Sequence, residues 1–312
     1  MARVFVTRRL PGTALERLGA EHETEVWPGR LPPPREELLA RTAEAEGLLS
    51  QLTDRVDAEL MDHAPSLRAI ANYAVGTDNV DLEAARERGI PVGNTPDVLT
   101  EATADLAFAL LLAAARRLPE AAQSIRDGEW VTFEPGRLLG RSVHGATLGI
   151  VGFGRIGRAV AARARGFEME VLATGTNSAP GLPLEDVLAR SDFISLHCPL
   201  TPATRHLIDA RALGRMRPTA ILVNAARGPI VDQAALVAAL HDGVIAGAAL
   251  DVTDPEPTPL DDPILSAPHV LITPHIGSAT TAARERMSEL AVENLLAGLA
   301  GEPMPHQAAA RR

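Results

Sequence analysis

The chain has 312 residues, which is enough for two domains of ordinary size. Its 30 basic and 40 acidic side chains give a net charge of −10, and all of the basic ones are arginine. The absence of lysine excludes a Schiff-base lysine, a Walker-type phosphate lysine and a lysine general base. The lone cysteine, Cys198, excludes an internal disulfide and a cysteine-rich metal site, so we expect no bound metal. No block of basic residues stands out, so neither nucleic acid nor a membrane surface is an expected partner.

The first ten residues carry three arginines and lack the long apolar core and small-residue cleavage site of a signal peptide. The longest apolar run, residues 106–115, is shorter than the roughly 20 residues that span a bilayer. These two features predict a cytoplasmic protein.

Short apolar runs alternate with helical patterns in the first third of the chain. Strands are expected at residues 3–7, 47–50, 67–70 and 90–92, and helices at 11–19 and 82–88. An alternation of strand and helix favours parallel sheets with crossover helices.

The segment that follows residue 99 is different. Thr100 can cap a helix, Glu101 suits its first turn, and the helix is expected over residues 102–118 with Pro119 just past its end. Its middle is apolar on every side, which predicts burial inside a domain or at a subunit interface. Residues 127–141, rich in glycine and proline, are expected to form a long surface excursion.

A second series of strands and helices begins at Thr147. Strands are expected at residues 147–151, 170–173, 193–196, 220–223, 246–250 and 270–272, helices at 155–165 and 233–240, and a last helix at 284–299. The two series predict an α/β protein with two doubly wound parallel sheets.

A glycine motif, G-x-G-x-x-G, lies at the start of the second series. Gly152, Gly154 and Gly157 follow a strand directly and open a helix, which is the context that dinucleotide binding requires. The first glycine permits a tight turn, the second lets the backbone approach a pyrophosphate, and the third lets helix and strand pack closely. The N-terminus of the helix then presents backbone N–H groups to the phosphates.

The strand after this helix should end near the adenosine ribose. An NAD site usually has an acidic residue there, about 20 residues beyond the motif. No acid occurs between residues 171 and 184, and Thr174, Gly175, Thr176 and Asn177 stand in its place. This composition favours NADP, although no arginine is present and NAD use stays possible.

Three charged residues each follow a predicted strand. Arg227, Glu256 and His275 lie after different strands of the second series, and ligands bind beyond the carboxyl ends of such strands. An arginine can bind a carboxylate in two hydrogen bonds, and a paired histidine and glutamate form an acid–base group. The combination suits the reduction of a 2-oxo acid by a nicotinamide hydride.

The sequence resembles the D-isomer-specific 2-hydroxyacid dehydrogenases over nearly its whole length, and most closely the glyoxylate/hydroxypyruvate reductase branch. The matching segments are residues 73–81, the glycine motif, Ala226-Arg227-Gly228, Asp254-Pro255-Glu256-Pro257 and residues 274–280.

The resemblance implies roles for individual residues. His275 donates a proton to the developing alkoxide, Glu256 keeps it protonated, and Arg227 binds the substrate carboxylate. The N–H groups of Val75 and Gly76, together with Ser278, complete the substrate contacts. The implied cofactor contacts are Thr103, Gly152, Gly154, Arg155, Ile156, Gly157, Thr174, Gly175, Thr176, Asn177, Cys198, Pro199, Ala225, Asp251 and Gly277.

The family also implies the domain organisation. Residues 1–97 and 279–312 are expected to form a flavodoxin-like substrate domain, and residues 98–278 a Rossmann-type dinucleotide-binding domain, with a cleft between them. A homodimer through the cofactor domain is implied, and Trp130 or Phe133 is a candidate to shape the substrate pocket of a neighbouring subunit.

Two alternatives remain at this point. The same chemistry on another 2-hydroxy acid is one, although the chain ends soon after its last predicted helix, which argues against the longer phosphoglycerate enzymes. The other is a dinucleotide-sensing binding protein without turnover, because fold alone does not fix function.

Overall fold

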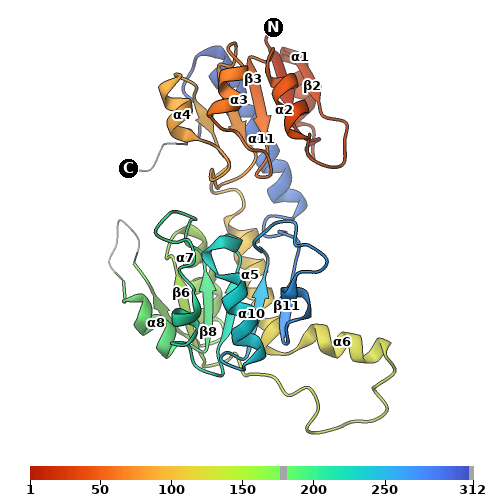
Figure 1. Cartoon of the computed structure of the whole chain (residues 1–312), viewed down its shortest axis with the longest axis vertical. Coiled ribbons are helices and arrows are strands. Elements are labelled where there is room, and N and C mark those ends of the chain that lie inside the picture. The colour runs from red at the N-terminus through yellow and green to blue at the C-terminus, as the bar shows by residue number, and fades with distance from the viewer. Residues whose placement is uncertain (176–180, 309–312) are drawn as a thin grey trace. The chain divides into compact units, whose positions relative to one another are not determined.

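The computed structural model describes residues 1–175 and 181–308. The chain divides into two compact units. Unit 1 consists of Met1–Leu99 and Ser278–Arg312, and unit 2 of Thr100–Gly277. Figure 1 shows a parallel sheet with helices in each of them, which confirms the predicted α/β class.

Unit 1 is built on a five-stranded parallel sheet with the order β2-β1-β3-β4-β5. This is the 2-1-3-4-5 order of flavodoxin-like folds, in which ligands bind beyond the carboxyl ends of the strands. The strands are β1 Arg3–Val6, β2 Glu23–Val26, β3 Gly47–Ser50, β4 Ala69–Asn72 and β5 Val92–Gly93.

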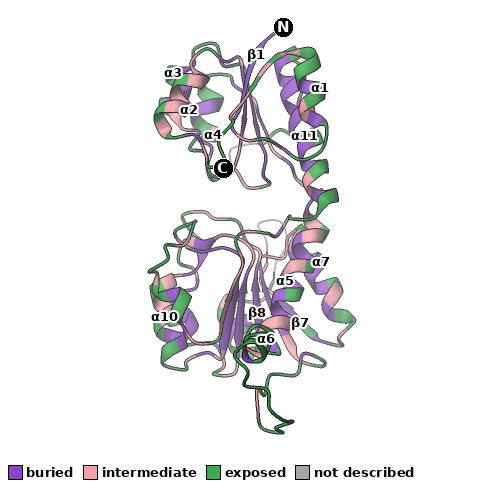
Figure 2. Cartoon of the chain, turned by 90° about the vertical axis from the view of Figure 1, so that its right-hand side faces the viewer, coloured by how far each residue is buried: buried purple, intermediate pink, exposed green. Residues whose placement is uncertain are grey.

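Helices cover both faces of this sheet (Figure 2). One face carries α1 Ala14–Glu21 and the long α11 Thr281–Ala300, and the other carries α2 Arg35–Thr42, α3 Ala58–His63 and α4 Leu82–Glu87. The inward side chains of the strands, among them Phe5, Leu48 and Ile70, are fully buried. Because both faces are covered, the strands read as apolar runs, which is why most were predictable from the sequence.

Unit 2 contains a six-stranded parallel sheet with the order β11-β10-β9-β8-β6-β7. A single parallel bridge between Thr174 and Leu182 lies beyond the end of β7, at the place of the third strand in the 3-2-1-4-5-6 order of a Rossmann fold, and β11 is one further strand. The strands are β6 Thr147–Val151, β7 Glu170–Ala173, β8 Phe193–Leu196, β9 Ile221–Asn224, β10 Gly247–Leu250 and β11 Val270–Ile272.

The first helix of unit 2, α5 Thr100–Ala115, packs against the sheet and against α7 Arg155–Arg165. It therefore lies inside the unit, which is the first of the two environments that its apolar sequence allowed. The other face carries α8 Leu184–Arg190, α9 Ala210–Leu213 and α10 Gln233–His241, with short 3₁₀ turns at Gly228–Ile230 and Pro263–Ser266.

The expected helix over residues 102–118, with Thr100 as its cap and Pro119 beyond its end, is wrong at both ends, because Thr100 is already the first residue of the helix. The helix ends at Ala115, and Pro119 lies in the first turn of a new helix, α6 Leu118–Arg126. A proline fits there because the first N–H groups of a helix have no partner within it. Figure 1 shows α6 and the excursion after it standing out from the rest of unit 2. Within the described part of the chain, no helix is both long and apolar enough to cross a membrane.

Candidate active site

The carboxyl edge of the unit 2 sheet gathers nearly all of the residues of that unit that the sequence singled out. Each lies at a strand end or in the loop that follows, and Thr103, near the start of α5, is buried beside Gly277. Parallel strands end at the same edge, so residues far apart in sequence meet there. The residues at this edge are Gly152, Gly154, Thr174, Gly175, Cys198, Pro199, Ala225, Arg227, Asp251, Glu256, His275 and Gly277.

The glycine motif has the geometry that a dinucleotide pyrophosphate needs. Gly152 has a φ of +95°, and a Cβ on it would lie 2.4 Å from the backbone nitrogen of Cys198, so no other residue fits this turn. A Cβ on Gly154 would meet nothing within 4 Å, so this glycine faces open space. The start of α7 has no side-chain cap and no acid in its first turn. Its N–H groups are therefore suited to bind phosphate.

The end of β7 lies beside the glycine motif. The hydroxyl of Thr174 accepts a hydrogen bond from the N–H of Gly152 at 3.0 Å, which ties the second strand to the motif. Gly175 follows directly and approaches Gly181 closely. Thr176 and Asn177, expected around the ribose, lie outside the described residues.

Two buried ionisable groups follow β8, and the sequence did not single out the first of them. Burial lowers the pKa of His197 to about 4, and its Nε2 pairs with the hydroxyl of Ser195 at 2.8 Å. Its buried Nδ1 has no partner among the described atoms. Burial raises the pKa of the Cys198 thiol to about 11. Both groups are therefore neutral at physiological pH.

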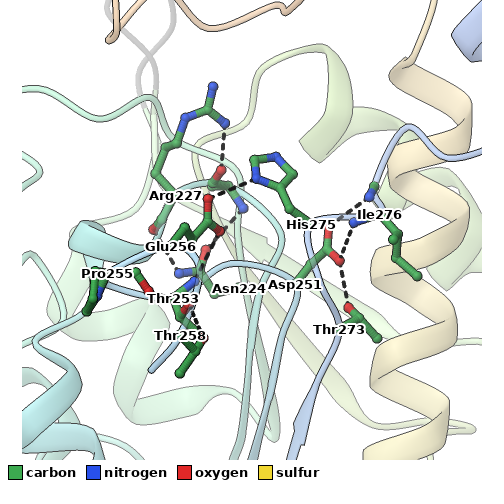
Figure 3. Close-up of polar contacts among 12 residues, drawn as sticks. Asn224, Arg227, Asp251, Thr253, Pro255, Glu256, Thr258, Thr273, His275 and Ile276 are labelled. Carbon is green, nitrogen blue, oxygen red and sulfur yellow. Dashed lines mark hydrogen bonds and ion pairs between the residues drawn. The ribbon is translucent and has the colours of Figure 1, made fainter. Parts of the chain in front are cut away.

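A buried carboxylate, that of Asp251, organises the loop after β11 (Figure 3). Its side chain accepts hydrogen bonds from the hydroxyl of Thr273 at 2.6 Å and from the N–H groups of Ile276 and Gly277 at 2.8 Å each. With only 1% of Asp251 exposed, the loop is fixed to the end of β10 by charge-assisted bonds. Thr273 is a part of this arrangement that sequence reasoning missed.

His275 and Glu256 form a direct pair. The Nδ1 of His275 lies 3.1 Å from Oε2 of Glu256, and the other carboxylate oxygen accepts the N–H of Thr253 at 3.3 Å. Their side chains are 27% and 30% exposed. His275 has a φ of +52°, in the left-handed region that a non-glycine residue adopts at a cost. Within the described residues, Nε2 of this imidazole has no partner, so it is available to a ligand.

Arg227 is held in a neighbouring loop by Asn224, which sequence reasoning also missed. The side chain of Asn224 donates to the carbonyl of Arg227 at 2.9 Å and accepts from the N–H of Ala226 at 3.0 Å. A Cβ on the next residue, Gly228, would lie 1.8 Å from the carbonyl oxygen of Thr253. This contact joins the Arg227 loop to the Glu256 loop, and Figure 3 shows Arg227, Glu256 and His275 close together beyond the strand ends.

Three predicted substrate residues belong to unit 1. Val75 and Gly76 lie in the loop after β4, and Ser278 is the first residue of the C-terminal segment of unit 1. The carbonyls of Val75 and Gly76 accept hydrogen bonds from the side chains of Asn94 and Asn72, at 2.8 and 3.0 Å. Ser278 directly follows Gly277, and its carbonyl accepts the N–H of Thr280. The carboxyl edge of this sheet thus presents its own set of polar contacts.

The Rossmann strand order, the glycine motif and a histidine–glutamate pair beside an arginine define a class, the dinucleotide-dependent oxidoreductases. Among residues 1–175 and 181–308, no group of three or more histidine, cysteine, aspartate and glutamate side chains is arranged to hold a metal ion.

Comparisons with known proteins agree with this class. Residues 108–277 match the NAD-binding domain of the D-isomer-specific 2-hydroxyacid dehydrogenases. A glyoxylate reductase of Korarchaeum cryptofilum is 49% identical over 97% of this chain and 95% of its own. A solved protein of Thermus thermophilus is 54% identical, with a TM-score of 0.93 and coverage of 98% and 100%. An NADPH-dependent glyoxylate/hydroxypyruvate reductase of Sinorhizobium meliloti, solved with NADP and malonate, is 36% identical, with a TM-score of 0.86 and coverage of 100% and 99%.

The chain belongs to the D-isomer-specific 2-hydroxyacid dehydrogenases, as the sequence motifs predicted. It is an NAD(P)-dependent dehydrogenase that acts on small 2-oxo and 2-hydroxy acids.

Proposed function

We propose that this enzyme reduces glyoxylate and hydroxypyruvate to glycolate and D-glycerate and uses NADPH better than NADH. The observation that carries the proposal is the His275–Glu256 pair at 3.1 Å, with Arg227 on the adjoining loop. The names of relatives that are 49% and 36% identical point to the same substrates.

The reaction adds a hydride and a proton across the C2 carbonyl. The reduced dinucleotide, when bound, supplies the hydride. Arg227 binds the substrate carboxylate and polarises the carbonyl, and His275 donates its Nε2 proton to the oxygen as negative charge develops there. Glu256 holds the imidazole by its Nδ1 and so fixes the ring for proton donation from Nε2. In unit 1, the N–H groups of Val75 and Gly76 bind the carboxylate, and Ser278 is a further substrate contact.

The residues that would hold the dinucleotide follow from the edge of the unit 2 sheet. The open face at Gly154 and the start of α7 at Arg155 and Ile156, which has no side-chain cap, suit the pyrophosphate. The ends of β8, β9, β10 and β11, together with α5, would contact the nicotinamide half. These contacts are Cys198, Pro199, Ala225, Asp251, Gly277 and Thr103.

The preference for NADPH rests on the end of β7. Thr174 and Gly175 stand where an NAD site has its acid, and the sequence contains no acidic residue between Glu170 and Glu185. An acid there would bind the ribose hydroxyls of NAD and repel the 2′-phosphate of NADP. We expect a moderate preference, because no arginine is present to bind that phosphate.

The same chain is expected to form a homodimer through unit 2. Large apolar side chains on α6 and on the excursion after it are exposed, with Phe133 at 85% and Trp130 at 70%. A soluble monomer rarely exposes apolar side chains in such density, and a second copy of this chain would cover them. Light scattering of the purified protein and of a Phe133→Asp variant tests this. A wild-type monomer would contradict it.

The function is tested by following the absorbance of the reduced nicotinamide. Purified protein is assayed with NADPH and NADH, each against glyoxylate, hydroxypyruvate, pyruvate and 3-phosphohydroxypyruvate. Faster turnover of the first two acids with NADPH is the expected result. A higher kcat/KM with NADH contradicts the cofactor preference. Dinucleotide binding without turnover of any acid contradicts the proposed reaction and favours a sensing protein.

A further inference from the structure

The loop after β4 is held by polar groups that follow the neighbouring strand, β5. Asn94 donates from its side chain to the carbonyl of Val75 at 2.8 Å, and the N–H of Thr95 donates to the carbonyl of Ala74 at 2.9 Å. Two consecutive peptide groups of the loop are therefore fixed by two consecutive residues of another segment.

These bonds determine the direction of the N–H groups that bind substrate. A peptide group is planar and its C=O and N–H point in opposite directions. The carbonyl of Ala74 shares its plane with the N–H of Val75, and the carbonyl of Val75 shares its plane with the N–H of Gly76. Each bond to a carbonyl thus orients one of the two N–H groups away from the donor. Among the described residues, neither of these N–H groups has an acceptor.

The next peptide group of the loop is held from the other side. Asn72, which ends β4 and is fully buried, donates to the carbonyl of Gly76 at 3.0 Å. Its own side-chain oxygen accepts from Ser50 at 3.1 Å and from Asn79 at 3.2 Å. The side chain of Asn79 also donates to the carbonyls of Gln51 and Asp54, so this side of the loop is joined to the segment after β3.

The backbone of Asn94 is itself fixed by α11 and by the segment that follows this helix. Its carbonyl accepts from the side chain of Asn294 at 2.8 Å, and its N–H donates to the carbonyl of His306 at 3.1 Å. Asn294 is fully buried and also accepts from the N–H of His306 at 2.9 Å. Because these anchors use the Asn94 backbone, the Asn94 side chain can be changed without removing them.

We propose that Asn94 is a positioning residue for substrate, which orients the Gly76 N–H toward the substrate carboxylate through the carbonyl of Val75. The inference rests on the proposed function. A neutral carboxamide suits this place, because it donates to a carbonyl without bringing negative charge near an anionic substrate. A carboxylate of the same shape would lose the donor and add the charge.

Two variants separate these contributions. Asn94→Ala removes one neutral hydrogen bond, and we expect the KM for the 2-oxo acid to rise about fivefold with kcat changed less than about twofold. Asn94→Asp keeps the shape, and we expect a rise of about tenfold. The KM for the dinucleotide should stay the same in both. A matched control is Trp27→Phe, which removes a side-chain donor to the carbonyl of Leu31, next to the opposite edge strand β2, and should leave both KM values unchanged.

A second readout does not depend on turnover. Amide hydrogen exchange of the free protein at residues 73–77 should be faster in Asn94→Ala than in the wild type and in Trp27→Phe. An unchanged KM for the 2-oxo acid in Asn94→Ala, or equal changes in kcat and KM, would overturn the inference. If the wild type turns over no acid, the proposed function fails, and unchanged exchange at residues 73–77 would then overturn the positioning by Asn94 as well.

Discussion

The carboxyl edges of the two parallel sheets are built from different polar groups. In unit 2 the edge carries Arg227, Asp251, Glu256 and His275. Glu256 contacts the imidazole of His275, and Asp251 accepts the N–H of Ile276 in the loop after β11. In unit 1 the loop after β4 is held by neutral carboxamides, those of Asn72, Asn79 and Asn94, which fix loop carbonyls, while the buried carboxyl of Asp54 binds Thr7 and the N–H of Gln51. The two strand orders are related, so topology alone does not determine which chemistry an edge provides.

This difference predicts that the two edges contribute to different steps of the reaction. Charged groups at the unit 2 edge should dominate the chemical step, because they interact with charge that develops in the transition state. Neutral amides at the unit 1 edge should contribute to substrate binding, which is equal in the ground state and the transition state. Substitutions at the two edges should therefore differ in size and in whether kcat or KM changes.

The largest effect is expected for Arg227→Ala. The variant loses the guanidinium that binds the substrate carboxylate and polarises the carbonyl, so kcat/KM should fall by about 10³-fold. The dinucleotide Kd, measured by calorimetry, should change little, because the glycine motif is untouched. Arg227→Lys keeps the charge but cannot bind the carboxylate in a bidentate manner, and it should recover only part of the activity. A variant with nearly wild-type kcat/KM would remove Arg227 from the site.

His197 is the neutral exception at the charged edge, and it predicts a pH dependence of stability. Burial lowers its pKa to about 4, so the folded protein stays unprotonated there while the unfolded chain takes up a proton below its ordinary value of 6.5. The contribution of neutral His197 to the free energy of unfolding is therefore complete above pH 6.5. About 3 kcal/mol of it is lost as the pH falls toward 4.

Urea unfolding of His197→Asn across this range measures the contribution. The free energy of unfolding of the variant should fall less steeply than that of the wild type between pH 6.5 and 4. The control is His144→Asn, at an exposed histidine of the same unit, and should follow the wild type. Parallel curves for His197→Asn and the wild type would contradict the assignment.

Glu256→Gln should have a smaller effect on catalysis than Arg227→Ala. The carboxamide can still hold Nδ1 of His275, but it places no negative charge beside the proton-donating ring, so we expect kcat/KM to fall about tenfold at neutral pH. Glu168→Gln, at an exposed histidine–glutamate contact of 3.7 Å, is the matched control. A wild-type kcat/KM in Glu256→Gln would argue that the charge of Glu256 plays no part in the reaction.

Gly154→Ala adds a single methyl group. It can be compared with a change in unit 1 at a glycine where a Cβ would also meet no atom within 4 Å. The added methyl group meets no protein atom within 4 Å but enters the space proposed for the pyrophosphate, so the dinucleotide Kd should rise about tenfold. Thermal stability should not change. Gly19→Ala, on α1 of unit 1, is equally unobstructed and should leave the Kd as it is and stabilise the helix by about 0.5–1 kcal/mol. Equal Kd values for Gly154→Ala and the wild type would contradict the proposed pyrophosphate site.

Much of the fold was predictable because buried parallel strands are apolar runs. The strand β6 Thr147–Val151 was predicted with its bounds, since it is apolar and ends at the glycine motif. The edge strand β2 Glu23–Val26 was missed, because it carries two glutamates and is only half covered. Pro119 was interpreted as following a helix when it begins one, since proline is compatible with both places.

The candidate site was predictable in its charged members and not in its supports. Arg227, Glu256 and His275 each follow a strand, and parallel topology brings such positions together. The supporting asparagines bind backbone carbonyls, whose directions depend on the path of each loop and leave no periodic pattern. One signal was available, because Asn72 and Asn224 are polar residues that end otherwise apolar strands.

The contact between Gly228 and the carbonyl of Thr253 has a consequence for altering this enzyme. A side chain at position 228 would have to displace the backbone of the second loop, so every substitution there moves the arginine and the acid–base pair together. In a library of variants, position 228 should tolerate no replacement. Attempts to broaden the substrate range should keep Gly228 and vary the excursion at 127–141, whose side chains are mostly exposed and can change without moving either loop.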